Sequence, residues 1–204
     1  IAAAVGAADV TTLARGYVPD DLLRHYPQRP LTLHVKAAGN LDHLSVEDLR
    51  ADWAGLLRLN ADGWASAVTT SHPTASVRFG LTTDDARPLM ALLPASLRGS
   101  VALPRGTTVR GKAGLRAGSY TADVRLTAAG GSLALTGRAD LQAESYASRL
   151  SPRRLSPAAF LPGIGIGPLT ADVRAEGRGF DPLSPHTRLA ARAHIDELHL
   201  DTLR

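Results

Sequence analysis

The sequence predicts an all-β protein built on an elongated, curled antiparallel sheet, groove-like or solenoid-like, with a few short helices. The main observation is a strict alternation of apolar and polar residues from Thr107 to Leu150, as arises when successive strand side chains point to opposite faces. Further alternating runs precede and follow this stretch. Helix signals are few and short, so helices cannot cover the apolar face of roughly a dozen strands.

Four consecutive strands are expected between Thr107 and Leu150. The pair Gly130-Gly131 marks the turn between the second and the third strand. The apolar-face residues are Val109, Gly111, Ala113 and Leu115, then Tyr120, Ala122, Val124 and Leu126, then Leu133, Leu135, Ala139 and Leu141, and finally Tyr146, Ser148 and Leu150. The residues between them are mostly charged or hydroxylated, so the sheet has one apolar and one polar face.

Further strands are expected at residues 31–38, 49–53, 57–62, 77–81, 169–175 and 194–200. Short helices are expected at residues 19–27, 83–94 and 156–162, because each segment opens with acidic or hydroxyl residues and ends at a proline. Residues 9–15 fit either a strand or half a helix.

The three prolines that end these helices predict a repeat. Pro27, Pro94 and Pro162 are about 67 residues apart, a spacing in the range of repeat architectures. The strand at residues 31–37 also matches residues 169–175 in register. We therefore divide the chain into units at residues 1–27 (partial), 28–94, 95–162 and 163–204 (partial), each a short helix plus roughly four or five strands.

Composition and charge narrow the classes of function. The 204 residues include 44% hydrophobic but only 4% aromatic residues, which suits an apolar surface that is lined and not tightly interlocked. The net charge is +4, yet the arginines are interleaved with aspartates and glutamates, as on a solvated exterior. Without cysteine there is no disulfide or thiolate metal site. We expect neither a nucleic-acid partner nor a cofactor.

Paired acidic residues and a glycine-rich segment do not predict catalysis, so we expect a protein that is not an enzyme. Asp20-Asp21 and Asp84-Asp85 both lie at helix starts, where carboxylates cap free N–H groups. The segment from Gly163 to Pro168 lacks the Lys-Ser/Thr ending of a phosphate loop and precedes a strand, so a linker is favoured. A Gly-x-Ser-x-Gly elbow is also missing from the sequence.

Histidines and tryptophans are the remaining candidates for a binding site. His194 and His199 flank two carboxylates, but alternation along a strand turns the two imidazoles to opposite faces, which does not suit a shared metal ion. Trp53 and Trp64 could line a ligand site, although a ring on a strand face is more often ordinary core. No metal site is expected.

The ends of the chain suggest that it is part of a longer protein. The first residue is Ile1, and the sequence contains neither a signal peptide nor an apolar run long enough to span a membrane. The chain ends directly after the strand-like run at residues 194–200. We expect an interior piece of a repeat array.

Several stretches resemble a family of envelope proteins. The run Glu176 to Pro182 follows a short helix, the residues Phe160-Leu161-Pro162 and an alternating strand, and this pattern is similar to the translocation and assembly module TamB family, in the form found in Bacteroidetes. The run from Ala38 to Leu41, together with the run from Leu49 to Gly55, also resembles it. The similarity extends over most of the chain but consists of repeat motifs.

This resemblance implies a function. The AsmA-like, repeating β-groove proteins bridge the inner and outer membranes across the periplasm, and their curled sheet (a β-taco) conducts lipid acyl chains through an apolar interior. The full-length protein would be anchored in the inner membrane and take part in outer-membrane biogenesis. Its implied partners are phospholipid acyl chains and an outer-membrane β-barrel protein, the latter through regions outside these 204 residues.

The predicted function is therefore lipid transport, support of outer-membrane protein assembly, or both. The residues expected to line the groove are Leu33, Val35, Leu59, Phe79, Val124, Leu126, Leu133, Leu135, Val173 and Ile195. The alternative is a structural β-solenoid of an envelope or surface protein, with a sealed core and no lipid transport. Small residues on the apolar face favour the open groove; they are Gly111, Ala113, Gly137, Ala139, Gly177 and Gly179.

Overall fold

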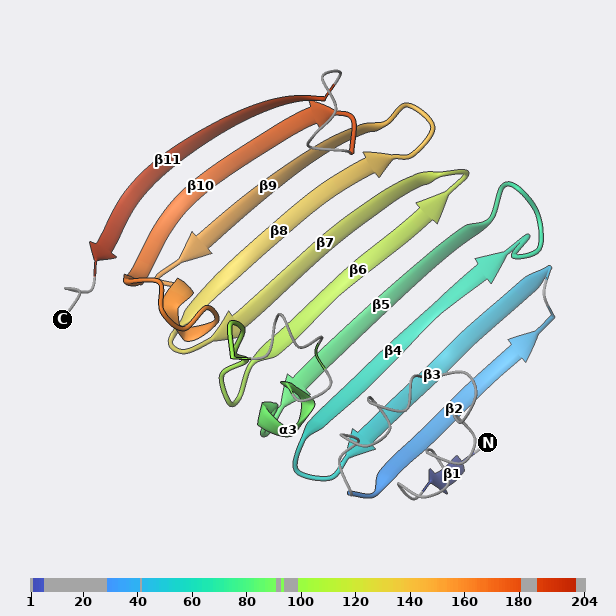
Figure 1. The fold of residues 1–204 in the computed structure, drawn as a ribbon. Helices are drawn as coiled ribbons and strands as arrows, with labels where there is room; N and C mark the ends of the chain where they lie inside the picture. Colours follow the sequence, from blue (N-terminus) through green and yellow to red (C-terminus); the bar gives the residue numbers. More distant parts are fainter. Residues whose placement is uncertain are drawn as a thin grey trace.

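The computed structural model describes residues 2–5, 29–40, 42–90, 93, 99–180 and 187–200. Eleven strands form one antiparallel sheet in which each strand pairs with its neighbours in sequence (Figure 1). The strands are β1 (Ala2–Val5), β2 (Leu31–Gly39), β3 (His43–Trp53), β4 (Leu57–Ser66), β5 (Thr74–Thr83), β6 (Thr108–Arg116), β7 (Ser119–Ala128), β8 (Gly131–Asp140), β9 (Ser145–Arg153), β10 (Ile166–Arg178) and β11 (Arg188–Leu200). The predicted all-β, curled antiparallel sheet is confirmed.

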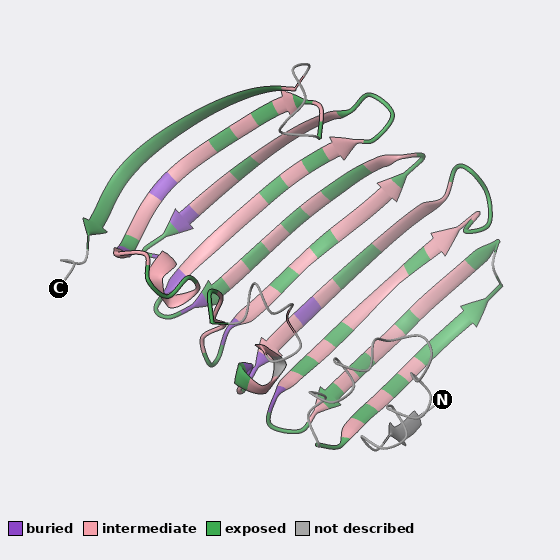
Figure 2. Ribbon diagram, viewed as in Figure 1, coloured by how far each residue is buried: buried purple, intermediate pink, exposed green. Residues whose placement is uncertain are grey.

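The cross-strand register gives the sheet two chemically distinct faces. Because partners in a ladder share a face, the pairs Leu59↔Leu81 and Leu126↔Leu133 place their side chains on the same side. The residues between them, such as Arg58 and Arg125, point to the other side. We call these sides the apolar face and the polar face. Figure 2 shows the alternation as stripes of intermediate and exposed residues along the strands.

The two ends of the strands differ. At the end where β5 and β9 finish, the connections carry the helix α3 (Arg87–Met90) and the 3-10 turn η1 (Pro157–Ala159) (Figure 1). We call this end of the strands the loop end. At the opposite end, the turn end, the connection between β6 and β7 has only Ala117 (φ 46°) and Gly118 (φ 87°) between the strands. Positive φ at both residues fits the tight hairpin turns that match strand twist.

The loop end contains the closed core of the described residues. The buried hydrophobic residues are Leu56, Ala86, Ala128, Leu155 and Ala171. Backbone hydrogen bonds hold the loops over them: the N–H groups of Asp84 and Asp85 donate to the Leu56 carbonyl (2.8 and 3.2 Å), and the Ala102 N–H donates to the Phe160 carbonyl (2.7 Å). The buried Thr107 hydroxyl donates to the Pro104 carbonyl (2.7 Å). Polar groups buried here are therefore satisfied.

Several local expectations need correction. The turn predicted at Gly130-Gly131 lies at Ala129-Gly130, and Gly131 already belongs to β8. The expected linker from Gly163 to Pro168 is shorter, since β10 begins at Ile166. Within the described residues of the segment 83–94, the expected helix has only the four residues of α3, and the segment at 156–162 forms a 3-10 turn and not an α-helix. Strand β1 was not predicted.

The repeat remains a prediction. Pro162 lies three residues after the last residue of η1, Ala159, near the place expected of a residue that ends a helical segment. Pro27 and Pro94, the helix at 19–27 and the undecided residues 9–15 lie outside the described residues. The division into four units is therefore untested.

Leu56→Ala should destabilise the protein strongly, because the Leu56 side chain is 0% exposed and anchors the loop end. Truncation of a buried leucine typically costs about 2–5 kcal/mol. Leu141→Ala is the matched control, since Leu141 is 52% exposed and should change stability by less than about 0.5 kcal/mol. Urea denaturation measures both. Equal effects would contradict the placement of the core at the loop end.

The single sheet should give the protein an elongated shape in solution. Ten spacings of about 4.8 Å between eleven strands extend the sheet by roughly 48 Å. A compact globule of 204 residues would have a radius of gyration of about 17 Å. We expect small-angle X-ray scattering to give a clearly larger radius. A value at the globular expectation would argue against an open sheet.

Candidate functional site

The ten residues expected to line the groove all lie on the apolar face. Leu33, Leu59, Leu126 and Leu133 fall in one row that runs across the strands through directly paired residues. Val35, Phe79, Val124, Leu135 and Val173 fall in the neighbouring row. Ile195 pairs with Ala171, two residues before Val173, and so continues the apolar face onto β11. The structure brings the predicted set together as a surface.

Among the described residues, the apolar face is covered only at the loop end. Ala171 is 1% exposed there, beside the loop residue Leu155 (9%). Away from this end, the apolar residues of β2 to β10 are mostly half-buried by their own neighbours, and no second layer of the described residues packs on them (Figures 1 and 2). Large side chains of this face that are exposed include Val77 (37%) and Tyr120 (43%). An apolar surface of this extent marks a binding site or an interface.

A hollow of about 480 Å³ lies on the apolar face over β5 to β9. Small residues form its floor: Ala113, Ala122, Gly137 and Ala139. Tyr120 and Tyr146 border it towards the turn end, and Phe180 stacks on Tyr146 with ring centroids 6.1 Å apart. The volume is within the range of about 300–1,000 Å³ usual for small-ligand sites.

The two tyrosines were absent from the predicted site, although their alternation with polar residues was visible in the sequence. The prediction favoured aliphatic residues, whereas the structure places Tyr120 and Tyr146 in paired positions opposite Ala139. A tyrosine at the margin of an apolar surface can keep its hydroxyl in water and its ring against apolar groups. The hollow therefore has an amphipathic border.

Strand β11 leaves the apolar face open at one side. Every residue of β11 is exposed, as the uniform colour of this strand in Figure 2 shows. Its apolar side chains include Leu189 (63%), Ile195 (53%) and Leu200 (70%). Thus the apolar rows reach the edge of the sheet without being capped by a described residue.

The polar face is held by cross-strand ion pairs. Arg78 donates to Asp62 (2.9 and 2.5 Å). Asp172 of β10 accepts from the Ser151 hydroxyl (2.6 Å) and from the guanidinium groups of Arg149 and Arg153, each at 2.8 Å. The Ser151 hydroxyl, followed by Arg149 and Arg153, lowers the pKa of Asp172 well below its usual range. This carboxylate therefore stays ionised and ties β9 to β10.

Asp84 and Asp85, the aspartate pair within the described residues, both have structural partners. Asp85 accepts from the Arg87 N–H (3.1 Å), the expected helix-capping bond, and from the guanidinium groups of Arg87 and Arg105. The two arginines hold the pKa of Asp85 well below its ordinary value. Asp84 pairs with Arg58 (3.2 Å). Asp20 and Asp21 lie outside the described residues.

His194 and His199 do not face opposite ways, so the reason given against a metal site was wrong. A register shift between Thr170 and Ala171 inserts one extra residue in β11 and restores both imidazoles to the polar face. Each has its own carboxylate: His194 Nε2 is 3.1 Å from Asp196, and His199 Nδ1 is 3.6 Å from Glu197. Among the described residues, no group of three or more acidic or histidine side chains could hold a metal ion.

The two tryptophans have different environments. Trp53 continues the apolar face at the loop end, and its indole N–H donates to the Arg29 carbonyl (3.2 Å). Trp64 pairs with Ser45 and Ser76 on the polar face and is 43% exposed. The two rings therefore do not line a common site.

The comparisons with known proteins gave no relative. No protein-family model, no curated protein and no solved structure matches the chain. Within the described part of the chain, none of the helices has the length and apolar character needed to cross a membrane.

Asp172→Asn should lower the melting temperature at neutral pH, because it removes the charge that holds Arg149 and Arg153. The folded pKa of Asp172 is depressed below the unfolded value of about 3.9, so its contribution is complete above that pH and is lost as pH falls through the folded pKa. The difference in melting temperature between Asp172→Asn and the unmodified protein should therefore become smaller as the pH falls into the acidic range.

Asp123→Asn is the control, since no hydrogen bond or ion pair within the described residues holds this carboxylate. Thermal unfolding from neutral to acidic pH compares the two variants. A difference for Asp172→Asn that stays constant with pH would contradict the ionic role of Asp172.

Proposed function

We propose that the chain is a segment of a periplasmic bridge whose apolar groove carries phospholipid acyl chains between the inner and outer membranes. Support of outer-membrane protein assembly, with an outer-membrane β-barrel protein as partner, belongs to the same proposal. The resemblance to the TamB family motivates the periplasmic setting and implies an inner-membrane anchor in the full-length protein. The observation that carries the proposal is that the described residues leave most of the apolar face of the sheet uncovered.

The shape of the apolar face fits hydrocarbon. Its rows run across the strands through directly paired residues, from Leu33 to Leu133 in one row and from Val35 to Val173 in the next. An acyl chain laid along either row would meet an apolar residue at every strand, including Phe79 and Gly111 in the second row, and no charged group. Burial against it would remove apolar surface from water at about 25 cal/mol per Å².

The neighbouring row of small residues fits a moving occupant. Gly137 pairs with Ala122 and Ser148, so this row is lower than the adjacent row that contains Val124, Leu135 and Leu150. A methyl group built at Gly137 would meet atoms only at 3.5 Å or more. A shallow, smooth floor lets hydrocarbon slide, whereas interlocking side chains would hold one pose.

The arrangement disfavours the alternative, a structural solenoid with a sealed core. A sealed solenoid buries its inward side chains, yet the apolar residues that are buried among the described residues lie at the loop end and include only two leucines, Leu56 and Leu155. Most of the predicted lining is half-buried, and Ile195 is 53% exposed. Hydrocarbon is the occupant that this surface suits best.

Val124→Arg tests the proposal against the sealed core. Val124 reaches over Gly111, since a methyl group built on that glycine would lie 3.0 Å from Val124 Cγ2, and it pairs with Leu135. An arginine in the groove should cost a passing acyl chain several kcal/mol. In the full-length protein we expect near-normal folding and abundance but loss of lipid transport, measured as phospholipid exchange between the two membranes.

Arg125→Glu is the matched control on the opposite face. Arg125 opposes Arg110, so a glutamate there replaces a like-charge pair by an opposite-charge pair and should leave transport unchanged. A photo-crosslinker at position 124 should capture lipid, and one at position 125 should not. If Val124→Arg unfolds the protein and position 124 captures no lipid, the sealed solenoid is the better description.

A further inference from the structure

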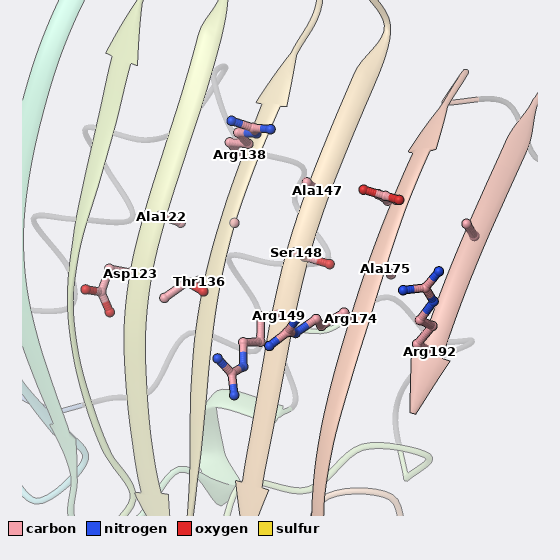
Figure 3. Close-up of a pocket in the computed structure, with 13 residues that line it drawn as sticks. Ala122, Asp123, Thr136, Arg138, Ala147, Ser148, Arg149, Arg174, Ala175 and Arg192 are labelled. Atoms are coloured by element: carbon pink, nitrogen blue, oxygen red, sulfur yellow. The ribbon is translucent and has the colours of Figure 1, made fainter. Parts of the chain in front are cut away.

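The polar face has a hollow of its own, of about 570 Å³, over β7 to β11 (Figure 3). Its charged side chains are mostly arginines: Arg138 of β8, Arg149 of β9, Arg174 of β10 and Arg192 of β11. The last three occupy one cross-strand row, because Arg174 pairs with Arg149 on one side and with Arg192 on the other. The register therefore places three arginines at paired positions on successive strands.

Within the described part of the chain, only one of these three charges is compensated by a direct contact. Arg149 donates to Asp172 at 3.1 and 2.8 Å. Among the described residues, neither Arg174 nor Arg192 has a hydrogen bond or an ion pair to a carboxylate. Like charges placed directly opposite each other destabilise a sheet, so this pair costs stability while it has no counter-ion.

The remaining lining defines where an anion would sit. Thr136 brings a hydroxyl group to the hollow, and Ala147 and Ala190 leave room between the longer side chains. Asp123 and Glu176 also line it, but neither carboxylate is in an ion pair with its arginines within the described residues. In Figure 3, Asp123 lies beside Thr136, across the hollow from Arg174 and Arg192. The arginine-rich side is therefore the side at β10 and β11, where Glu176 of β10 is the one carboxylate of the described residues that lines the hollow.

We propose that this hollow binds a phosphate-bearing anion through Arg174 and Arg192, with Arg138 and Thr136 as further donors. A guanidinium group presents its N–H groups in a planar fork that matches two phosphate oxygens, and hydrogen bonds between charged groups are the strong ones. A bound phosphate also removes the repulsion across the Arg174↔Arg192 pair. The site lies on the opposite face from the lipid groove and does not depend on that proposal.

The test is isothermal titration with inorganic phosphate, and separately with glycerol 3-phosphate, at constant ionic strength set by chloride. The double variant Arg174→Ala with Arg192→Ala should bind each probe at least roughly tenfold more weakly. The matched control is Arg110→Ala with Arg125→Ala, which removes another directly opposed arginine pair of the polar face that does not line the hollow. This control should bind both phosphate probes as tightly as the unmodified protein does. The Val124→Arg variant, which changes the opposite face, should do the same.

The comparison of the two probes identifies the source of the phosphate. Tighter binding of glycerol 3-phosphate supports a lipid headgroup or a related ester, and equal binding supports the free ion. Chemical shifts of the Arg174 and Arg192 side chains in the unmodified protein give a second measurement that needs no variant. Equal weakening by both double variants, or titration that leaves these side-chain resonances unmoved, would overturn the proposal.

Discussion

The ladder of hydrogen bonds between consecutive antiparallel strands is the interaction on which the rest of this structure depends. A protein with two packed layers can lose part of one ladder and still be held by its core. Here the described residues form a single sheet, and the buried hydrophobic residues gather at one end of the strands. Stability must therefore come from backbone pairing and from contacts between directly opposed side chains.

This dependence makes the register the main constraint on the sequence. A slip of one residue would exchange the faces and move Val124 to the side of Arg125. Side-chain pairs on both faces stabilise the observed register. Examples are Leu126↔Leu133 on the apolar face and Arg149 with Asp172 on the polar face. The tight turns at Ala117-Gly118 and Ala129-Gly130 fix the offset between neighbouring strands.

Alternation was sufficient to predict the fold and the composition of the apolar face, because side-chain period is a local property of the chain. It identified the strands from Thr107 to Leu150 and placed ten separate residues on one surface. The helices were less predictable: acidic starts and proline ends mark a segment but do not decide whether α-helix or a single 3-10 turn forms. At η1 the described helical segment is only three residues long.

Features that depend on the offset between strands could not be predicted. The extra residue near Asp196 changes which residues of β11 share a face, and no residue in that run signals a bulge. Likewise Arg149, Arg174 and Arg192 are 25 and 18 positions apart in sequence, so their alignment exists only once the register is known. In the sequence the arginines are interleaved with acidic residues, which we interpreted as an evenly solvated exterior. No sign of the row of three arginines is therefore visible before the register is known.

The two faces of the sheet can therefore evolve and act separately. Each strand contributes alternate residues to each face, so a substitution such as Val to Leu in the apolar rows leaves the polar rows and the ladder unchanged. The apolar face needs only continuity, which many combinations of aliphatic and small residues provide. The hollow over β7 to β11 instead needs particular side chains at paired positions, because Arg174 and Arg192 lie opposite each other in only one register. A surface of the first kind suits a mobile, chemically uniform occupant, and a site of the second kind suits a fixed, charged one.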